Sequence, residues 1–331
     1  MFKLNNLLEL LRKEVPSGGF FPPDAPELVV KKVSTGIPPL DLILGGGLPR
    51  RRLTIVFGDE GHGKSFLAHK LVQSFQQRKL TSVYVDVERC FEPLWAEKIG
   101  IDLRDTNTLI IAQPGTGEDA ANVVAESLKA GVDLVILDSV AALAPARLLE
   151  TNAEDLFIGL LARLMSPSVG RWQQMNENSV LLLINQIRDV IGTPIHEERM
   201  PGGRAQGFAA GLKLRVRRRG WLTEKNKRIG FPMFFRVEKT KIPGVVPWSS
   251  CEVPFLFDGT LDVVESLINV AIEKGIIRQD GANYYLWETK TYGRNNLVQQ
   301  FRDNPDLVEA LLKTAGLAEE ESQESEPGNI M

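Results

Sequence analysis

A glycine-rich segment between a strand-like run and a helix-like run constrains the fold of this chain more than any other feature. Residues 58–65 read Gly-Asp-Glu-Gly-His-Gly-Lys-Ser, after the apolar run 53–57 and before the helix-like run 66–71. A buried strand, a glycine-rich loop and a helix in this order match the phosphate-binding pattern G-x-x-x-x-G-K-S/T. Backbone N–H groups of such a loop face one concavity, and the helix N-terminus adds positive potential. We therefore expect a bound nucleotide here rather than a bland glycine-rich turn.

The end of this loop carries the charge and the hydroxyl that nucleotide binding needs. Lys64 is expected to reach the β- and γ-phosphates, and the Ser65 hydroxyl is expected to ligate Mg²⁺. ATP and Mg²⁺ are therefore the predicted cofactors. The predicted nucleotide-binding residues of the loop are Gly58, Asp59, Glu60, Gly61, His62, Gly63, Lys64 and Ser65.

Composition argues against several classes of protein. Of the 331 residues, 43% are hydrophobic, so a sizeable core is available. Cys90 and Cys251 are the only cysteines and form no CxxC pair, which argues against a disulfide scaffold or a structural zinc site. The N-terminus lacks a secretory apolar core, and no apolar run is long enough to span a bilayer. We expect a cytoplasmic protein without a membrane partner.

Strands and helices alternate from about residue 33 to about residue 258. This alternation predicts βαβ units, and hence an α/β fold with a mainly parallel twisted sheet covered on both faces. The predicted strands are 53–57, 82–86, 108–112, 134–138, 180–185, 212–218, 233–238 and 251–257, with helices near 63–78, 118–130 and 156–177.

The regions outside this core divide the chain further. Residues 1–32 contain an apolar stripe of leucines at helical spacing, which predicts an N-terminal helix and a linker that dock on a core or on a neighbouring subunit. Residues 33–258 form the predicted ATPase core, and residues 259–317 a small α/β domain with helices at 260–274, 294–302 and 305–315 and a hairpin around Gly281. Residues 318–331 form an acidic tail that we expect to be disordered.

Three polar residues follow apolar strands at the edge where ligands of α/β sheets bind. Asp138 ends the run 134–138 and is expected to hold Mg²⁺, although it could only cap the strand. Glu88 follows the run 83–87 and could orient the attacking water, or be a surface residue. Gln186 ends the run 180–185 and could report the γ-phosphate to the long segment that follows.

Several further motifs resemble those of the RecA-type homologous-recombination ATPases of bacteria and bacteriophages, over nearly the whole chain. The motifs are Ser34-Thr35-Gly36, Leu44-Gly45-Gly46-Gly47-Leu48-Pro49, Asp138-Ser139-Val140-Ala141-Ala142-Leu143, Asn185-Gln186-Ile187-Arg188, Ile191-Gly192 and Gly202-Gly203. The C-terminal unit and the acidic tail are also similar to those of the family. The resemblance implies a P-loop core of the RecA type with two DNA-binding loops, at about 148–158 and 187–205.

The resemblance implies a role for individual residues around ATP. Glu88 would be the catalytic glutamate, acting with Lys64 and with Gln186 as the γ-phosphate sensor. Trp95 would stack on the adenine. Lys239 and Lys241 would reach the ATP of the neighbouring subunit and stabilise charge in the transition state. Without the family, two such lysines on a strand would be read as a solvated face.

The resemblance also implies the DNA contacts, which position a strand without reading its sequence. The implied DNA-binding residues are Ile158, Arg163, Arg188, Ile191, Gly192, Gly202 and Gly203. A basic cluster lies between residues 213 and 228, with Lys213, Arg215 and Arg217 alternating along one strand. It could be an electrostatic track for DNA or a charged sheet edge that resists aggregation.

These features together predict a DNA-dependent ATPase that forms ATP-bound helical filaments on single-stranded DNA and catalyses homologous pairing and strand exchange. Its predicted partners are single- and double-stranded DNA and further copies of itself in a head-to-tail filament, with single-strand-binding and loader proteins as further candidates. The alternatives are a ring-forming ATPase of the helicase type and a non-catalytic recombination mediator. Divergent residues, such as Gly61-His62 and Arg204, suggest a phage or otherwise distant member, in the bacterial cytosol or nucleoid or in a phage-infected cell.

Overall fold

The computed structural model describes residues 4–15, 19–146, 155–189 and 198–317. Contacts divide the chain into two units, residues 1–31 and residues 32–331, which are described separately. The first unit contains the predicted N-terminal helix, α1 (Leu4–Glu14), and a 3₁₀ turn, Pro26–Leu28. The last turn of α1 carries Arg12 and Lys13, cations that complement the negative end of the helix dipole.

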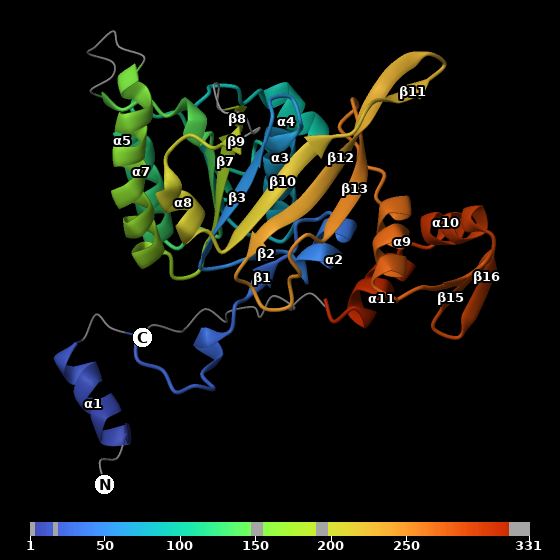
Figure 1. Cartoon of the computed structure of the whole chain (residues 1–331), viewed down its shortest axis with the longest axis horizontal. Coiled ribbons are helices and arrows are strands. Elements are labelled where there is room, and N and C mark those ends of the chain that lie inside the picture. The colour runs from blue at the N-terminus through green and yellow to red at the C-terminus, as the bar shows by residue number, and fades with distance from the viewer. Residues whose placement is uncertain (1–3, 16–18, 147–154, 190–197, 318–331) are drawn as a thin grey trace. The chain divides into compact units, whose positions relative to one another are not determined.

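The centre of the second unit is a mixed sheet that has nine strands among the described residues (Figure 1). Six of them are mutually parallel, because helical crossovers connect most of them, and the inner strands of this group are largely buried on both faces, whereas the outermost strand is partly exposed. In spatial order these strands are β5 (Leu109–Ala112), β4 (Ser82–Asp86), β6 (Leu134–Asp138), β7 (Val180–Gln186), β3 (Arg52–Gly58) and β10 (Leu212–Arg218).

Antiparallel strands extend the sheet beyond β10. The long strand β12 (Lys227–Thr240) pairs with β10, and β11 (Leu222–Glu224) and β13 (Ser250–Leu256) both pair with β12. Lys213 and Arg215 of β10 pair with β3 on one side and with β12 on the other, so these two residues do not lie on a sheet edge. For them the interpretation as a protected edge was therefore wrong.

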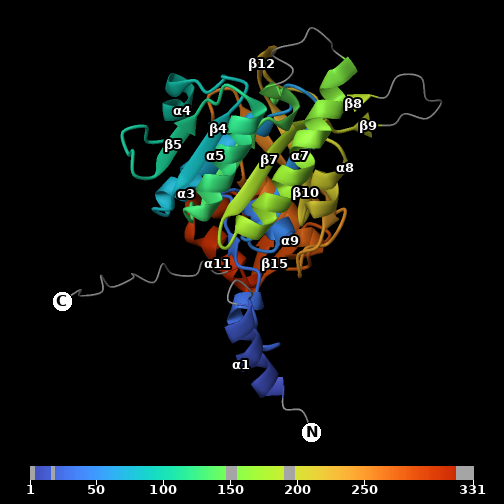
Figure 2. The ribbon, with the colours of Figure 1, turned by 90° about the vertical axis from the view of Figure 1, so that its left-hand side faces the viewer.

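Helices cover both faces of the parallel part of the sheet (Figures 1 and 2). Helices α5 (Gly117–Lys129) and α7 (Asp155–Met175) pack together on one face. Helix α3 (Lys64–Gln77) lies on the other face and contacts β3, β4 and β6. Side chains along a strand point to the two faces in turn, and those that point to α3, such as Tyr84, alternate with those that point to α5 and α7. The predicted α/β fold class is therefore confirmed.

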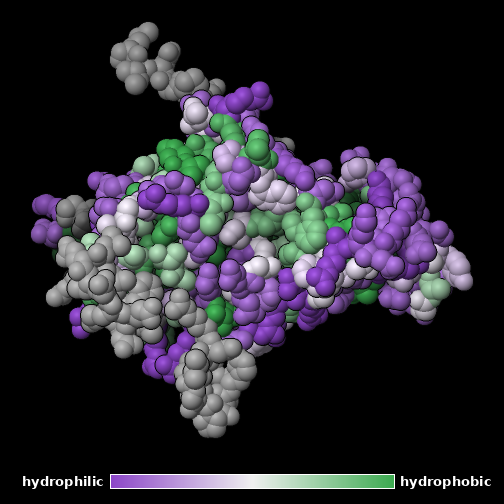
Figure 3. All heavy atoms as spheres, turned by 90° about the horizontal axis from the view of Figure 1, so that it is seen from above, coloured by the Kyte–Doolittle hydropathy of each residue, from purple (hydrophilic) through white to green (hydrophobic). Residues whose placement is uncertain are grey.

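The surface of the described residues gives no sign of a membrane span, since no helix there is both long and apolar enough to cross a bilayer. On the face that Figure 3 shows, hydrophilic residues predominate, with smaller hydrophobic patches between them.

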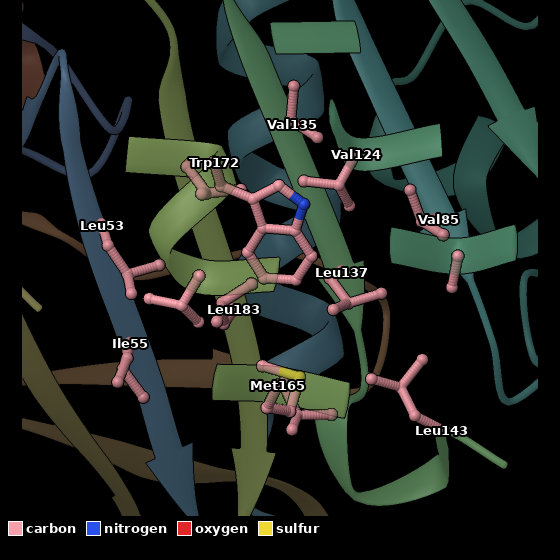
Figure 4. Close-up of a cluster of buried hydrophobic side chains, with 14 of the residues drawn as sticks. Leu53, Ile55, Val85, Val124, Val135, Leu137, Leu143, Met165, Trp172 and Leu183 are labelled. Carbon is pink, nitrogen blue, oxygen red and sulfur yellow. The ribbon is translucent and has the colours of Figure 1, made fainter. Parts of the chain in front are cut away.

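The main core lies between α5, α7 and the sheet (Figure 4). Trp172 of α7 is 1% exposed and lies at its centre, among Leu53, Val124 and Leu183. Its indole N–H donates to the carbonyl of Ala121, 3.0 Å away, so the polar atom of this large side chain is satisfied. This core fixes the strands whose carboxyl ends carry the candidate site.

Short elements connect and complete this framework. They are β1 (Lys32–Val33), β2 (Leu48–Pro49), α2 (Pro38–Leu44), α4 (Pro93–Ile99), the 3₁₀ turn Val140–Ala142, β8 (Arg188–Asp189), β9 (Glu198–Arg199) and α8 (Arg204–Ala209). Helix α2 begins with prolines in its first turn and ends at Gly45, whose left-handed conformation suits glycine.

The small C-terminal part has the predicted helices and a three-stranded antiparallel sheet where a two-stranded hairpin was predicted. Its elements are α9 (Val264–Glu273), β14 (Arg278–Asp280), β15 (Asn283–Leu286), β16 (Thr289–Tyr292), α10 (Arg294–Asp303) and α11 (Asp306–Thr314). Helix α9 packs on α2 and β13, which ties this part to the large sheet. The division into domains at residue 258 stays a prediction.

Candidate nucleotide-binding site

The glycine-rich loop leaves β3 at Gly58 and enters α3 at Lys64, as predicted. At Gly58 a Cβ would stand 2.1 Å from the carbonyl oxygen of Val216 on β10, so only glycine fits there. Gly61 has φ +70°, and a Cβ there would meet no atom within 4 Å, so the middle of the loop opens onto free space. Such a loop can approach phosphate oxygens closely through its backbone N–H groups.

Lys64 is buried, with its charged end held inside the loop. Its Nζ atom donates to the carbonyl oxygen of Asp59 at 2.6 Å. Burial lowers the pKa of Lys64, and the negative charges of Asp138 and Glu88 partly oppose this. Within the described part of the chain the ammonium group donates to this one protein acceptor, which leaves two of its protons to donate to an anion.

The predicted Mg²⁺ ligands Ser65 and Asp138 lie together. Asp138 is 5% exposed, and its carboxylate accepts a hydrogen bond of 2.6 Å from the Tyr84 hydroxyl, while Ser65 is near enough to favour its ionised form. Burial raises the pKa of Asp138, and a divalent cation beside it would favour the ionised form.

The donor set suits Mg²⁺ held together with a nucleotide. Among the described residues, no group of three or more His, Cys, Asp or Glu side chains could hold a metal by itself. One carboxylate and one hydroxyl are the usual protein share at such a site, because Mg²⁺ takes its other oxygens from phosphates and water. The residues present therefore fit a nucleotide-bound Mg²⁺.

Glu88 lies in the exposed turn after β4, facing the Asp138 strand. Its Oε1 atom accepts a hydrogen bond of 2.5 Å from the Ser139 hydroxyl. The buried carboxylate of Asp86 shapes this turn, because it accepts the backbone N–H groups of Cys90 and Phe91, each at 3.0 Å. Sequence reasoning missed the roles of Asp86 and Ser139, although both stand at strand ends beside residues that it singled out.

Trp95 lies on α4, next to the first turn of α3. Its ring centroid is 6.4 Å from that of Phe66, and the ammonium of Lys98 lies 5.5 Å from the ring centre. The ring is half-buried, so part of its surface remains open beside the loop. Stacking of Trp95 on an adenine stays a prediction.

Gln186 ends β7 beside a buried amide network that leads to the far end of the second loop. Its backbone N–H donates to Oδ1 of Asn185 at 2.9 Å. The Asn185 amide in turn donates to Gln206 at 3.1 Å and to the carbonyl of Pro201 at 3.0 Å. Both amide side chains are fully buried, so the end of β7 and the start of α8 are joined by satisfied polar contacts.

Gly202 and Gly203, two of the predicted DNA-binding residues, lie within this network. Gly203 precedes α8 with φ +77°, and its carbonyl accepts a hydrogen bond of 3.4 Å from Gln206. The structure therefore places the end of the second loop against the strand that ends at Gln186.

Lys239 and Lys241 meet at the C-terminus of α8. Lys239 donates to the carbonyl of Gly207 at 2.6 Å, and Lys241 donates to that of Phe208 at 2.8 Å. Cations at this end of a helix are stabilised by its unpaired carbonyls. Burial lowers the pKa of Lys239, and the nearby charge of Lys241 lowers it further. Within one protomer, then, both lysines contact the C-terminal end of α8, the helix whose Gln206 side chain contacts Asn185.

The predicted DNA contacts are only partly placed. Arg163 is exposed on α7 and lines a surface hollow together with Glu118 and Arg171. Arg188 lies in β8, opposite Arg199 of β9, and Ile158 lies in the first turn of α7. Ile191 and Gly192 lie outside the described residues, as do residues 148–154 of the first predicted loop and 190–197 of the second.

Two of the basic residues of β10, Arg215 and Arg217, form ion pairs. The side chain of Arg215 is 8% exposed and contacts Glu198 at 2.5 Å and Glu238 at 3.9 Å. Arg217 lies 3.6 Å from the same Glu198. Because Glu198 is in β9, these arginines hold the stem of the second loop to the sheet. The interpretation of Arg215 as part of an open DNA track was therefore wrong.

This fold and site define a class of protein, a P-loop protein in which the loop, a strand-end aspartate and a glutamate after the neighbouring strand converge at one sheet edge. A family model described as RecA N-terminal domain matches residues 4–262. The chain belongs to the RecA family.

Curated relatives cover nearly the whole chain. It is 34% identical to Protein RecA of Thermus aquaticus over 316 residues, which are 93% of this chain and 92% of the relative. Protein RecA of Chlorobaculum tepidum is 34% identical over 92% of this chain and 89% of its own length. The RecA protein of Rhodospirillum rubrum is 34% identical over 88% of this chain and 81% of its own length.

Proposed function

We propose that this chain is a DNA-dependent ATPase that polymerises head to tail on single-stranded DNA and catalyses homologous pairing and strand exchange. Family membership supports ATP hydrolysis and DNA recombination as the general activity. The observation that carries the proposal furthest is the amide network from Gln186 through Asn185 and Gln206 to α8. It offers a route by which a bound γ-phosphate can act on the second loop.

In this proposal the loop residues bind and orient ATP. Lys64 contacts the β- and γ-phosphates, and Ser65 and Asp138 hold Mg²⁺. When bound, Mg²⁺ would neutralise charge on the phosphate oxygens. Glu88 orients the attacking water and accepts its proton, while its hydrogen bond with Ser139 fixes one carboxylate oxygen.

Lys239 and Lys241 have a second role in the assembled filament. We propose that they exchange their contacts with α8 carbonyls for the ATP of the neighbouring subunit. A cation supplied in trans stabilises charge in the transition state, as an arginine finger does. It also makes the growth of the filament depend on ATP.

DNA binding in the proposal is independent of sequence. The DNA backbone is contacted by Arg163, Arg188 and the glycines of the second loop. Ile158 and Ile191 separate groups of bases. Sequence is then read by base pairing with a second strand. The site of action would be the cytosol or nucleoid of a bacterium or of a phage-infected cell.

A strand-exchange assay tests this function. The protein is incubated with single-stranded DNA, a labelled homologous duplex, ATP and Mg²⁺, and the transfer of the labelled strand is followed. We expect transfer with homologous but not heterologous duplex, and none without ATP. Lys64→Ala should abolish transfer, whereas Lys129→Ala, which changes an exposed lysine of α5, should not. Unwinding of the duplex irrespective of homology would instead identify a helicase-type ATPase.

A further inference from the structure

A buried tyrosine touches the aspartate that we assign to Mg²⁺. Tyr84 is 2% exposed in the middle of β4, and its hydroxyl donates to Oδ2 of Asp138 at 2.6 Å. The register explains the contact, because Tyr84 lies opposite Ile136 on the parallel strand β6, two residues before Asp138. The Tyr84 side chain therefore reaches across from β4 to the last residue of β6, at the end of the sheet that carries the site.

Two further rings fix the orientation of Tyr84. The imidazole of His69 stacks on it at 27°, with centroids 5.4 Å apart, and Phe91 meets it edge-on at 5.6 Å. Phe91 also packs edge-on against His69 at 5.3 Å. Its backbone is held by Asp86. The tyrosine ring is therefore enclosed on two sides and cannot turn its hydroxyl away from Asp138 without repacking the cluster.

His69 contributes to this cluster by its flat face. Its side chain is buried, and neither ring nitrogen has a hydrogen-bond partner among the described residues. A buried polar ring without partners is destabilising, so its presence here calls for another reason than stability. The geometry offers one such reason, because the His69 ring stacks on Tyr84 and holds it in place.

We propose that Tyr84 is a positioning residue that sets the orientation of the Asp138 carboxylate toward Mg²⁺. This inference rests on the proposed function, since it takes Asp138 as a ligand of nucleotide-bound Mg²⁺. A carboxylate is planar, so a hydrogen bond that fixes Oδ2 also fixes the direction of the other oxygen. Partners of this kind around a metal ligand tune metal affinity while leaving the metal's other ligands in place.

The competing explanation is that the hydroxyl only satisfies a buried polar pair. Both explanations predict that Tyr84→Phe lowers the melting temperature, because the buried carboxylate loses a donor. Only the positioning role predicts a weaker response to Mg²⁺. The deciding measurement is therefore the Mg²⁺ dependence of nucleotide binding.

The test is a titration of a fluorescent ATP analogue at a series of Mg²⁺ concentrations, beginning in EDTA. For Tyr84→Phe we expect the half-saturating Mg²⁺ concentration to rise by about tenfold, with affinity in EDTA unchanged. Tyr284→Phe is the matched control. It removes the hydroxyl of a buried tyrosine in β15, which accepts a hydrogen bond of 3.3 Å from Gln279, far along the chain from the site. It should leave the Mg²⁺ response unchanged.

A double variant tests whether Tyr84 acts through Asp138. In an Asp138→Asn background, Tyr84→Phe should add no further shift in the Mg²⁺ response. An unchanged Mg²⁺ midpoint in Tyr84→Phe, or an equal further shift in the double variant, would overturn the inference and leave the proposed function standing. A wild-type protein whose ATP binding ignores Mg²⁺ would overturn both.

Discussion

At the scale of single residues, His69 couples stability to pH. Burial lowers its pKa from 6.5 to about 4, with the charge of Asp86 opposing. The unfolded chain therefore takes up a proton at a higher pH than the folded chain does. Unfolding binds protons between these two values, so the folded state loses stability as the pH falls through this window.

We predict that replacing His69 removes this acid sensitivity. Between pH 7 and pH 5 the wild-type protein should lose about 2 kcal/mol of unfolding free energy through His69, and His69→Leu should not. Asp41 acts in the opposite direction, because burial raises its pKa to about 6. Urea unfolding of both proteins at the two pH values isolates the His69 contribution. Parallel pH profiles for the two proteins would contradict the assignment.

Glu88 gives the sharpest prediction for catalysis. Glu88→Gln should retain ATP binding and lose hydrolysis by about 100-fold or more, since the amide cannot accept the proton of water. Glu97→Gln on α4 changes an exposed glutamate of the same region and is the control. Equilibrium binding and steady-state hydrolysis are measured on the same preparations. Unchanged hydrolysis would remove Glu88 from the mechanism.

The position of a site residue could be predicted from the sequence where a motif fixes its own geometry, and the roles of these residues stay predictions. The loop 58–65, Asp138 and Glu88 were placed together because each follows a strand of one parallel sheet. Tyr84, His69 and Phe91 were not found, since their contacts join a strand, a helix and the segment after β4, and leave no pattern in the sequence. The same holds for Gln206, whose partner Asn185 is 21 residues away.

At the scale of elements, an ion-pair cluster holds the stem of the second loop. Glu198 of β9 contacts Arg215 and Arg217 of β10, and Arg215 also contacts Glu238 of β12. Arg215 is nearly buried, so the loss of a partner costs more here than at the surface.

Glu198→Gln should therefore destabilise the protein by about 1–3 kcal/mol and expose the backbone amides of β8 and β9 to hydrogen exchange. Glu252→Gln, which loses an ion pair with Arg219 between two exposed side chains, should cost about 0.5 kcal/mol or less. Denaturant unfolding measures the loss of stability, and hydrogen exchange monitored by mass spectrometry measures the exposure of the β8 and β9 amides. Equal effects of the two variants would contradict the account.

Most long elements could be predicted from the sequence because each of them shows its own period. Strands such as 134–138 read as continuous apolar runs, which is typical of strands buried on both faces. The short elements α2, α4, α8 and β8–β9 were missed, because two to seven residues are too few for a period to emerge. The position of β10 inside the sheet was also missed, since its charged residues are compensated by partners distant in sequence.

At the scale of the whole molecule, the proposed contribution of Lys241 to a neighbouring subunit can be tested by complementation. Lys241→Ala and Glu88→Gln should each be inactive alone. A mixture should recover activity. Where a Lys241→Ala subunit supplies Glu88 and its Glu88→Gln neighbour supplies Lys241, the ATP site between them is complete. Random mixing in equal amounts predicts about a quarter of the wild-type rate. A mixture no more active than its components would place Lys241 outside the neighbouring site.

The central claim is that ATP, DNA and self-assembly are coupled in one filament. The most direct measurement is ATP hydrolysis with and without single-stranded DNA, with negative-stain imaging of the same samples. The account predicts that DNA stimulates hydrolysis and that helical filaments form when ATP and DNA are both present. Closed rings, or hydrolysis indifferent to DNA, would contradict it.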